Sequence, residues 1–179
     1  MVDKRLELVK KLENLDPTKL KILIGFDGFV DEIIHVVDKR QDSSNYTRVD
    51  NIEALASRIE KAAGLSTNIE LVPVQKKIGG NGPIMCNALS KHDGEVTYLG
   101  ALGYPNIDEV FKGLEDNVTP YSFANPGHTD ALEFFDGKLL FGKMTSLNDV
   151  TYVNLIKSIG LDKLKEILGN TDLFATVNW

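Results

Sequence analysis

Cysteine is almost absent from this chain, which removes one way of holding a fold together. Cys86 is the only cysteine among 179 residues, so no internal disulfide can form. No apolar run approaches the ~20 residues that a membrane-spanning helix needs. Residues 1–16 alternate charged side chains with Leu and Val, unlike a secretory signal. We therefore expect a cytoplasmic globular protein, with Cys86 as a buried structural thiol rather than a nucleophile.

Several functional classes also lack their usual signatures. The net charge is −6, and no cluster of Lys and Arg with interleaved aromatic residues occurs, so nucleic acid is not an expected partner. His35, His92 and His128 show no metal-ligand spacing with the single cysteine. Neither a phosphate-binding P-loop nor the nucleophile elbow of the α/β-hydrolases is present. The hydrophobic content of 42% and the charged content of 26% suit one soluble domain without repeats or linkers.

Glycine, in contrast, is concentrated in one informative stretch, residues 79–103. Its first four residues, 79–82, read Gly-Gly-Asn-Gly and precede Pro83. Glycine permits positive φ and close backbone approach, and proline suits the first position of a helix. The pattern predicts a tight loop, then a helix that ends near Gly94, then an apolar strand over 96–99. The free N–H groups at the helix start are expected to attract an anion or a polar ligand.

This stretch resembles the N-terminal signature of the PfkB (ribokinase-like) carbohydrate kinases. The matching positions are Gly79, Gly80, Gly82, Ala88, Leu89, Gly94, Val96, Gly100 and Gly103. One position departs from the pattern, because Ile84 stands where the family often has Asn. The resemblance implies an α/β fold with a central, mostly parallel sheet flanked by helices and a small β lid. It also implies transfer of the γ-phosphoryl group of ATP, with Mg²⁺, to a hydroxyl of a sugar or nucleoside.

By this resemblance, residues 1–179 form the N-terminal part of one ribokinase-like domain. Lid elements are expected near 32–49 and 68–78, with an inserted helix at 51–63. The apolar run at 33–37 is expected to be a strand at the rim of the sheet. A second lid strand at 69–77 contains a proline, which cannot donate to a ladder, so an edge strand is favoured. Relatives in the family often form homodimers through such lid strands.

The other elements follow from local patterns. Residues 3–14 have helical spacing that places Leu6, Val9 and Leu12 on one face. Residues 22–24 are a short apolar run of the kind found in buried parallel strands. Asp136-Gly137 between two apolar runs predicts a hairpin. The inserted helix is expected to have Asp50 as its cap. Further expected elements are a short helix at 107–114 capped by Asn106, helices near 149–158 and 161–168, and a core strand at 173–179.

Two acids follow the first predicted strand at its carboxyl end, where ligands bind in open α/β sheets. The resemblance implies that an Asp in this place accepts hydrogen bonds from sugar hydroxyls. A carboxylate suits this role because its two oxygens can accept from two adjacent hydroxyls. Asp31 is the favoured candidate and Asp27 is its rival. Each could instead be a solvated loop acid.

The other candidate contacts lie in the glycine loop and at the end of the chain. The resemblance implies that the loop with Gly79 and Gly80 holds substrate hydroxyls. Asn81 matches the polar residue after this pair, although it could equally be a turn or helix-cap residue. Asn178 matches a strand end where some relatives place a polar sugar contact. Glu133 lies in an apolar strand stretch, so a structural salt bridge is expected for it.

The phosphoryl-transfer machinery is missing from the sequence. Such a transfer needs an anion cradle, a metal site and usually a base. PfkB-like kinases supply these from a Gly-Ala-Gly-Asp motif in their C-terminal half, and no such motif occurs here. We therefore expect the substrate-binding half of a sugar kinase, incomplete at its C-terminus, without a catalytic residue or a site for ATP or Mg²⁺. An exposed strand edge near 173–178 should follow.

Two alternatives remain open at this point. The first is a catalytically inactive sugar-binding or regulatory module of the same fold, which Ile84 favours slightly. The second is a non-kinase α/β protein whose glycine loop is purely structural.

Overall fold

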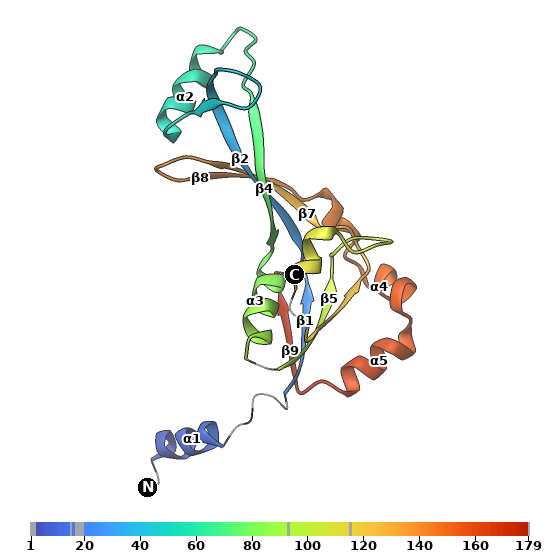
Figure 1. Ribbon diagram of the computed structural model, residues 1–179. Coiled ribbons are helices and arrows are strands. Elements are labelled where there is room, and N and C mark those ends of the chain that lie inside the picture. Colours follow the sequence, from blue (N-terminus) through green and yellow to red (C-terminus); the bar gives the residue numbers. More distant parts are fainter. Residues whose placement is uncertain (1–2, 15, 17–19, 93, 115, 179) are drawn as a thin grey trace.

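Two β-sheets organise the chain, and a computed structural model describes residues 3–14, 16, 20–92, 94–114 and 116–178. The first sheet has four strands in the order β6-β5-β1-β9, and every neighbouring pair is parallel. These strands are β1 (Lys21–Phe26), β5 (Glu95–Gly100), β6 (Val118–Ser122) and β9 (Leu173–Val177). This sheet forms the lower body of the molecule in Figure 1.

Helices cover both faces of the first sheet. α3 (Asn81–Ser90) packs on the face that carries Ile22, Ile24 and Tyr98. α4 (Tyr152–Ile159) and α5 (Leu161–Gly169) pack on the opposite face, because successive strand residues point to opposite sides. The predicted α/β fold, a mostly parallel sheet flanked by helices, is confirmed. No helix within the described residues is both long and apolar enough to cross a bilayer.

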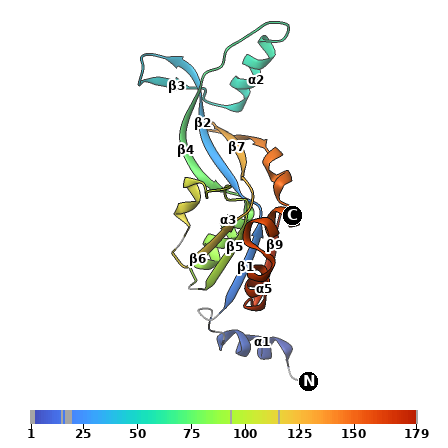
Figure 2. The ribbon, with the colours of Figure 1, turned by 90° about the vertical axis from the view of Figure 1, so that its right-hand side faces the viewer.

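The second sheet has five strands and stands beyond the carboxyl ends of the first (Figures 1 and 2). Its strands are β2 (Phe29–Arg40), β3 (Tyr46–Arg48), β4 (Leu71–Gly79), β7 (Gly127–Glu133) and β8 (Lys138–Lys143). The long strand β2 pairs antiparallel with β3 and β4 and parallel with β7. α2 (Ile52–Lys61) covers one face through Leu55, which packs in a cluster with Ile34 and Leu132.

The strand predicted at 33–37 proves to be only the middle of β2. Asp31 therefore lies within a strand and not in a loop. Its backbone is aligned with Lys77 of β4 on one side and Thr129 of β7 on the other, so a polar residue is held in extended conformation by both neighbours. β4 is the expected edge strand, since among the described residues it pairs with β2 alone. The hairpin at Asp136-Gly137 is also present, and its strands belong to this second sheet.

Two helix caps differ from the predictions. α2 is capped by Asn51, whose side chain accepts from the Ala54 N–H, and not by Asp50. The segment predicted as a helix at 107–114 is only a 3-10 turn, η2 (Glu109–Gly113), and its cap is Asp108 rather than Asn106. Neighbouring polar residues compete for the same cap position, so local sequence rarely decides between them. A second 3-10 turn, η3 (Thr145–Asp149), was not predicted.

The helix predicted near the N-terminus is present as α1 (Lys4–Glu13), capped by the Asp3 side chain. None of its residues is buried, and Leu6, Val9 and Leu12 are exposed. Figure 1 shows α1 standing apart from both sheets. The amphipathic pattern therefore predicted the helix correctly. Within the described residues, however, the apolar face of α1 packs against no other element.

The expected exposed edge near 173–178 is also present. β9 lies at the end of the first sheet and pairs only with β1 within the described part of the chain. Leu173 and Phe174 on this strand are about half exposed. The predicted strand continued to Trp179, which lies outside the described residues, whereas β9 ends at Val177.

Glu133 forms the structural ion pairs that its apolar surroundings predicted. Its carboxylate lies 2.9 Å from the Lys138 ammonium and 3.9 Å from the Arg48 guanidinium. The hydrogen bond from Lys138 lowers the pKa of the Glu133 carboxyl, and the nearby positive charges of Lys138 and Arg48 act in the same direction. Glu133 thus joins β7 to β8 and β3 and has a structural explanation.

Cys86 is fully buried in α3, and burial raises the pKa of its thiol to about 12. The thiolate is the reactive form, so the native thiol is expected to react with maleimide on the order of 100-fold or more slowly than the unfolded thiol at about pH 8. Labelling time courses with and without urea, read by mass spectrometry, measure this difference. Equal rates in both conditions would contradict the buried placement.

Candidate functional site

The first sheet has a topological switch point between β1 and β9. The chain passes from β1 to β5 and β6 on one side and later returns as β9 on the other side of β1. In open α/β sheets, ligands bind in the crevice outside the carboxyl ends of the strands at such a point. Asp27 follows β1 and Asn178 follows β9, and the register that aligns Phe26 with Val177 makes them neighbours. The Asn178 side-chain amide donates to Asp27 Oδ2 at 3.2 Å.

The Asp27 carboxylate is the centre of a buried hydrogen-bond network. Asp27 is only 4% exposed. Oδ2 accepts from the Asn81 backbone N–H at 3.0 Å, and Oδ1 accepts from the Gly82 N–H at 2.9 Å. The Tyr98 hydroxyl lies 3.3 Å from Oδ1 and also donates to the Asp27 backbone carbonyl. A negative charge at the N-terminus of α3 is stabilised by these N–H groups and by the helix dipole.

This network corrects two predictions about the glycine loop. The N–H groups expected to attract an external anion are instead bonded to the protein's own Asp27. The helix also begins at Asn81, two residues before the predicted start at Pro83, and it ends at Ser90, before Gly94. The carboxylate explains the earlier start, because it satisfies the first helical N–H groups. A proline in third place is still tolerated, since its missing N–H would have no partner inside the helix.

Asp31 lies beside this network, on β2 of the second sheet. A Cβ atom placed on Gly79 would lie 2.5 Å from each oxygen of the Asp31 carboxyl group. Gly79 therefore lets the carboxylate lie directly on the backbone of β4, which a larger residue would prevent. Among the described residues, no hydrogen-bond or ion-pair partner holds the Asp31 carboxylate. It keeps its full capacity to accept hydrogen bonds from a ligand.

The glycine loop at residues 79–81, which lies in space beside both Asp31 and Asp27, has a shape that only glycine adopts easily. Gly80 has φ of +89°, in the region that L side chains rarely occupy. Asn81 is the first residue of α3 and is exposed, while Ile84, one turn later, is 55% exposed. The predicted residues thus form two adjacent groups. Asp27 is bonded to Asn81 and Asn178 and lies against Gly80, and Asp31 lies over Gly79.

Asp27 and Asn178 line a cavity of about 240 Å³. Leu147 and Val150, in and just after η3, form its apolar wall. Apolar walls with a few converging polar groups are usual for small-molecule sites. Neither wall residue was a predicted site residue. Leu147 lies outside every predicted element, and Val150 falls in the helix predicted near 149–158, whereas α4 begins only at Tyr152.

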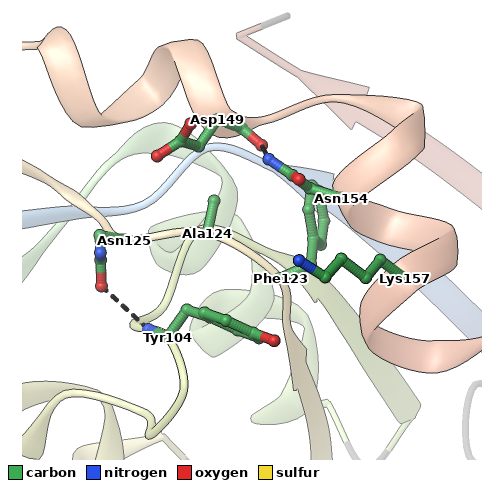
Figure 3. Close-up of a pocket in the computed structure, with 7 residues that line it drawn as sticks. All are labelled: Tyr104, Phe123, Ala124, Asn125, Asp149, Asn154 and Lys157. Atoms are coloured by element: carbon green, nitrogen blue, oxygen red, sulfur yellow. Dashed lines mark hydrogen bonds between the residues drawn. The ribbon is translucent and has the colours of Figure 1, made fainter.

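Another cavity, of about 210 Å³, lies beside η3 (Figure 3). Its lining residues are Tyr104, Phe123, Ala124, Asn125, Asp149, Asn154 and Lys157. Asn125 Oδ1 accepts from the Tyr104 N–H at 2.9 Å, and the Asn154 amide donates to the Asp149 carbonyl at 2.8 Å. None of the predicted site residues lines it. The switch-point cavity is therefore the better candidate for the substrate.

A nucleotide's metal ion would need converging carboxylates or imidazoles. The described part of the chain contains no group of three or more His, Cys, Asp or Glu side chains that could hold a metal ion. The site residues present here are suited to bind hydroxyl groups, and the phosphoryl-transfer step is not assigned to any of them.

Comparison with known proteins places this arrangement in a family. The family model described as prokaryotic ketohexokinase matches residues 7–179, nearly the whole chain. The chain belongs to the prokaryotic ketohexokinase family. The predicted relationship to the PfkB (ribokinase-like) sugar kinases is confirmed.

Individual relatives agree with this family membership. A ketohexokinase of Haloferax volcanii is 28% identical over 161 residues, which are 89% of this chain and 43% of that protein. A crystal structure titled as a possible 1-phosphofructokinase from Thermotoga maritima has a TM-score of 0.51 at 15% identity and covers 88% of this chain. The crystal structure of Sa239 has a TM-score of 0.50 at 13% identity and covers 87% of this chain.

The structural matches at this low identity show a shared fold. The chain spans less than half the length of these three relatives, between 43% and 45% of each. The ketohexokinase-family chain therefore corresponds to one part of those proteins, the part that carries the switch point and the second sheet.

Proposed function

We propose that this chain is the sugar-binding part of an ATP-dependent kinase whose substrate is a ketohexose. The observation that carries the proposal is the Asp31 carboxylate, which lies over Gly79 and has no partner within the described residues. A partly buried carboxylate with unused acceptor capacity, next to a glycine loop, is suited to hold two neighbouring hydroxyl groups of a sugar. Membership of the prokaryotic ketohexokinase family supports a ketohexose as that sugar.

The remaining contacts follow from the same geometry. We assign substrate hydroxyls to the backbone of Gly79 and Gly80 and to the Asn81 side chain, which is exposed at the start of α3. Asn178 offers its carboxamide oxygen, because its amide nitrogen is bonded to Asp27. Asp27 lines the cavity, but its carboxylate oxygens already accept from the loop and from Asn178, so we assign to it the role of holding the loop. The sugar would then lie between these polar groups and the apolar wall of Leu147 and Val150.

The second sheet is proposed to act as a lid over this site. Its segments at 32–49 and 68–78 flank the helix at 51–63, and Asp31 ties the base of the sheet to the substrate. β4 is an edge strand with exposed Leu71 and Val74, which supports pairing of two copies through the lid. ATP with Mg²⁺ is the proposed phosphoryl donor, and a cytoplasmic location is proposed from the single buried cysteine.

An assay of the natural full-length protein tests the function. Purified protein incubated with ATP, Mg²⁺ and D-fructose is expected to form hexose phosphate and ADP in equal amounts. The 179-residue chain alone is expected to bind fructose without turnover. D-Glucose and adenosine are the matched controls, because they separate a ketohexose kinase from an aldose or nucleoside kinase.

Each outcome has a distinct meaning. Product formed with fructose, and with neither glucose nor adenosine, supports the proposal. Fructose binding by the full-length protein without product would favour the inactive sugar-binding module. Product only with adenosine, or no binding of any of the three compounds, overturns the assignment of a ketohexose.

A further inference from the structure

One buried side chain connects the glycine loop to the core of the first sheet. Tyr98 on β5 is completely buried and packs in the cluster that contains Ile24 and Cys86. Its hydroxyl is the one polar atom of its side chain, and it donates to the backbone carbonyl of Asp27. The same hydroxyl lies 3.3 Å from Asp27 Oδ1. Burial and then the negative charge of Asp27 raise the pKa of the Tyr98 hydroxyl far above its ordinary value, so it stays a donor.

The surrounding backbone is shaped to receive this side chain. A Cβ atom on Gly82 would overlap both the Tyr98 hydroxyl and Asp27 Oδ1. A Cβ atom on Gly100 would lie 2.7 Å from Tyr98 Cε1. Gly82 and Gly100 therefore make room for the Tyr98 side chain, and this steric need explains glycine at both positions without any contact to the substrate. Such close fitting fixes the position of the hydroxyl relative to the start of α3.

We propose that Tyr98 is a positioning residue for sugar binding, an inference that rests on the proposed function. Tyr98 is buried and cannot touch the sugar. It holds Asp27 at both its carbonyl and its carboxylate, and Asp27 in turn holds the N–H groups of Asn81 and Gly82. The orientation of the loop at 79–81 is therefore set from the core through one hydroxyl group.

The chemistry of the hydroxyl separates this role from simple packing. Phenylalanine would fill the same space and keep the apolar contacts of the ring. It would leave the Asp27 carbonyl without the one donor that the described residues provide, and it would take a donor from beside Oδ1. The carboxylate would then be free to rotate away from the α3 N-terminus. The expected consequence is a less ordered loop in a correctly folded protein.

The test is Tyr98→Phe in the full-length protein, measured by fructose titration calorimetry. We expect fructose affinity to fall about tenfold, the equivalent of one hydrogen bond's contribution. The backbone amide resonances of Asn81 and Gly82, read by NMR without sugar, are expected to move upfield as their bonds to Asp27 weaken. Leu164→Val, in the separate cluster under α5, is the control for a general loss of core packing.

The results test the role of Tyr98 separately from the proposed sugar-binding function. Unchanged affinity of Tyr98→Phe, or an equal loss in Leu164→Val, overturns the role of Tyr98 and leaves the proposed function standing. Failure of the wild-type protein to bind fructose overturns the proposed function and this inference with it. Weaker binding in Tyr98→Phe alone, with shifted Asn81 and Gly82 amides, supports both.

Discussion

Replacement of Asp27 by alanine is expected to lower the free energy of unfolding by about 3–4 kcal/mol. The substitution removes a carboxylate that is 4% exposed and accepts from the N–H groups of Asn81 and Gly82 and from the Asn178 amide. The Tyr98 hydroxyl also loses its contact with Oδ1 but can still donate to the backbone carbonyl of residue 27. A buried donor left without an acceptor lowers the stability of the fold by more than its intact hydrogen bond had raised it. The loss is a large share of the ~5–15 kcal/mol that keeps a typical domain folded.

Urea unfolding followed by circular dichroism measures this change. A lower midpoint with an unchanged slope against urea would identify a true loss of stability. Asp31→Ala is the matched control, because Asp31 lacks a partner within the described residues, and its removal is expected to change stability by less than about 0.5 kcal/mol. Similar effects of the two substitutions would contradict the separate roles of the two acids.

Local patterns were sufficient for β1 and β5 of the first sheet and for α4 and α5, but not for β6, whose residues resemble a loop because they include Pro120. β1 and β5 are short apolar runs next to glycines, and α4 and α5 are each stopped by a glycine or a polar residue. These signals lie within a few residues of the element that they define, so they can be read without knowing the fold. The glycine loop also carried a family resemblance, which the family match confirms.

The role of Asp27 could not be predicted in the same way. Its partners Asn81 and Asn178 are 54 and 151 residues away in sequence. Asn178 meets Asp27 because β9 returns beside β1, and Asn81 meets it because α3 packs on the face of the sheet that carries Ile22 and Ile24. The sequence therefore places both acids near the site but does not reveal that Asp27 accepts from the first N–H groups of α3.

The second sheet shows a related limit. Asp31 and Glu32 resemble a loop by composition, yet both lie in β2 because strands on either side supply the hydrogen bonds of their backbone. Residues 127–143 gave a clear hairpin signal, but the hairpin alone does not say which sheet it joins. No local pattern marked Leu147 or Val150 as a site residue, and only the cavity beside Asn178 reveals them.

Asp31→Asn is expected to weaken fructose binding by about 100-fold while leaving stability unchanged. Asparagine has nearly the same shape, so Gly79 can still accept the side chain. It keeps one acceptor oxygen but loses the negative charge and places an amide donor where the second hydroxyl would donate. Two charge-assisted hydrogen bonds are therefore replaced by at most one neutral bond.

Titration calorimetry with fructose on the full-length protein provides the measurement, with urea unfolding as the check on folding. Glu32→Gln is the control, because Glu32 is the next residue of β2, points to the opposite face of the strand and lies 3.8 Å from Lys76. Equal losses of fructose affinity in the two variants would mean that binding depends on the negative charge of β2 as a whole and not on the position of Asp31. An unchanged affinity in Asp31→Asn would remove the observation on which the sugar site depends, even if the protein proved to be a kinase.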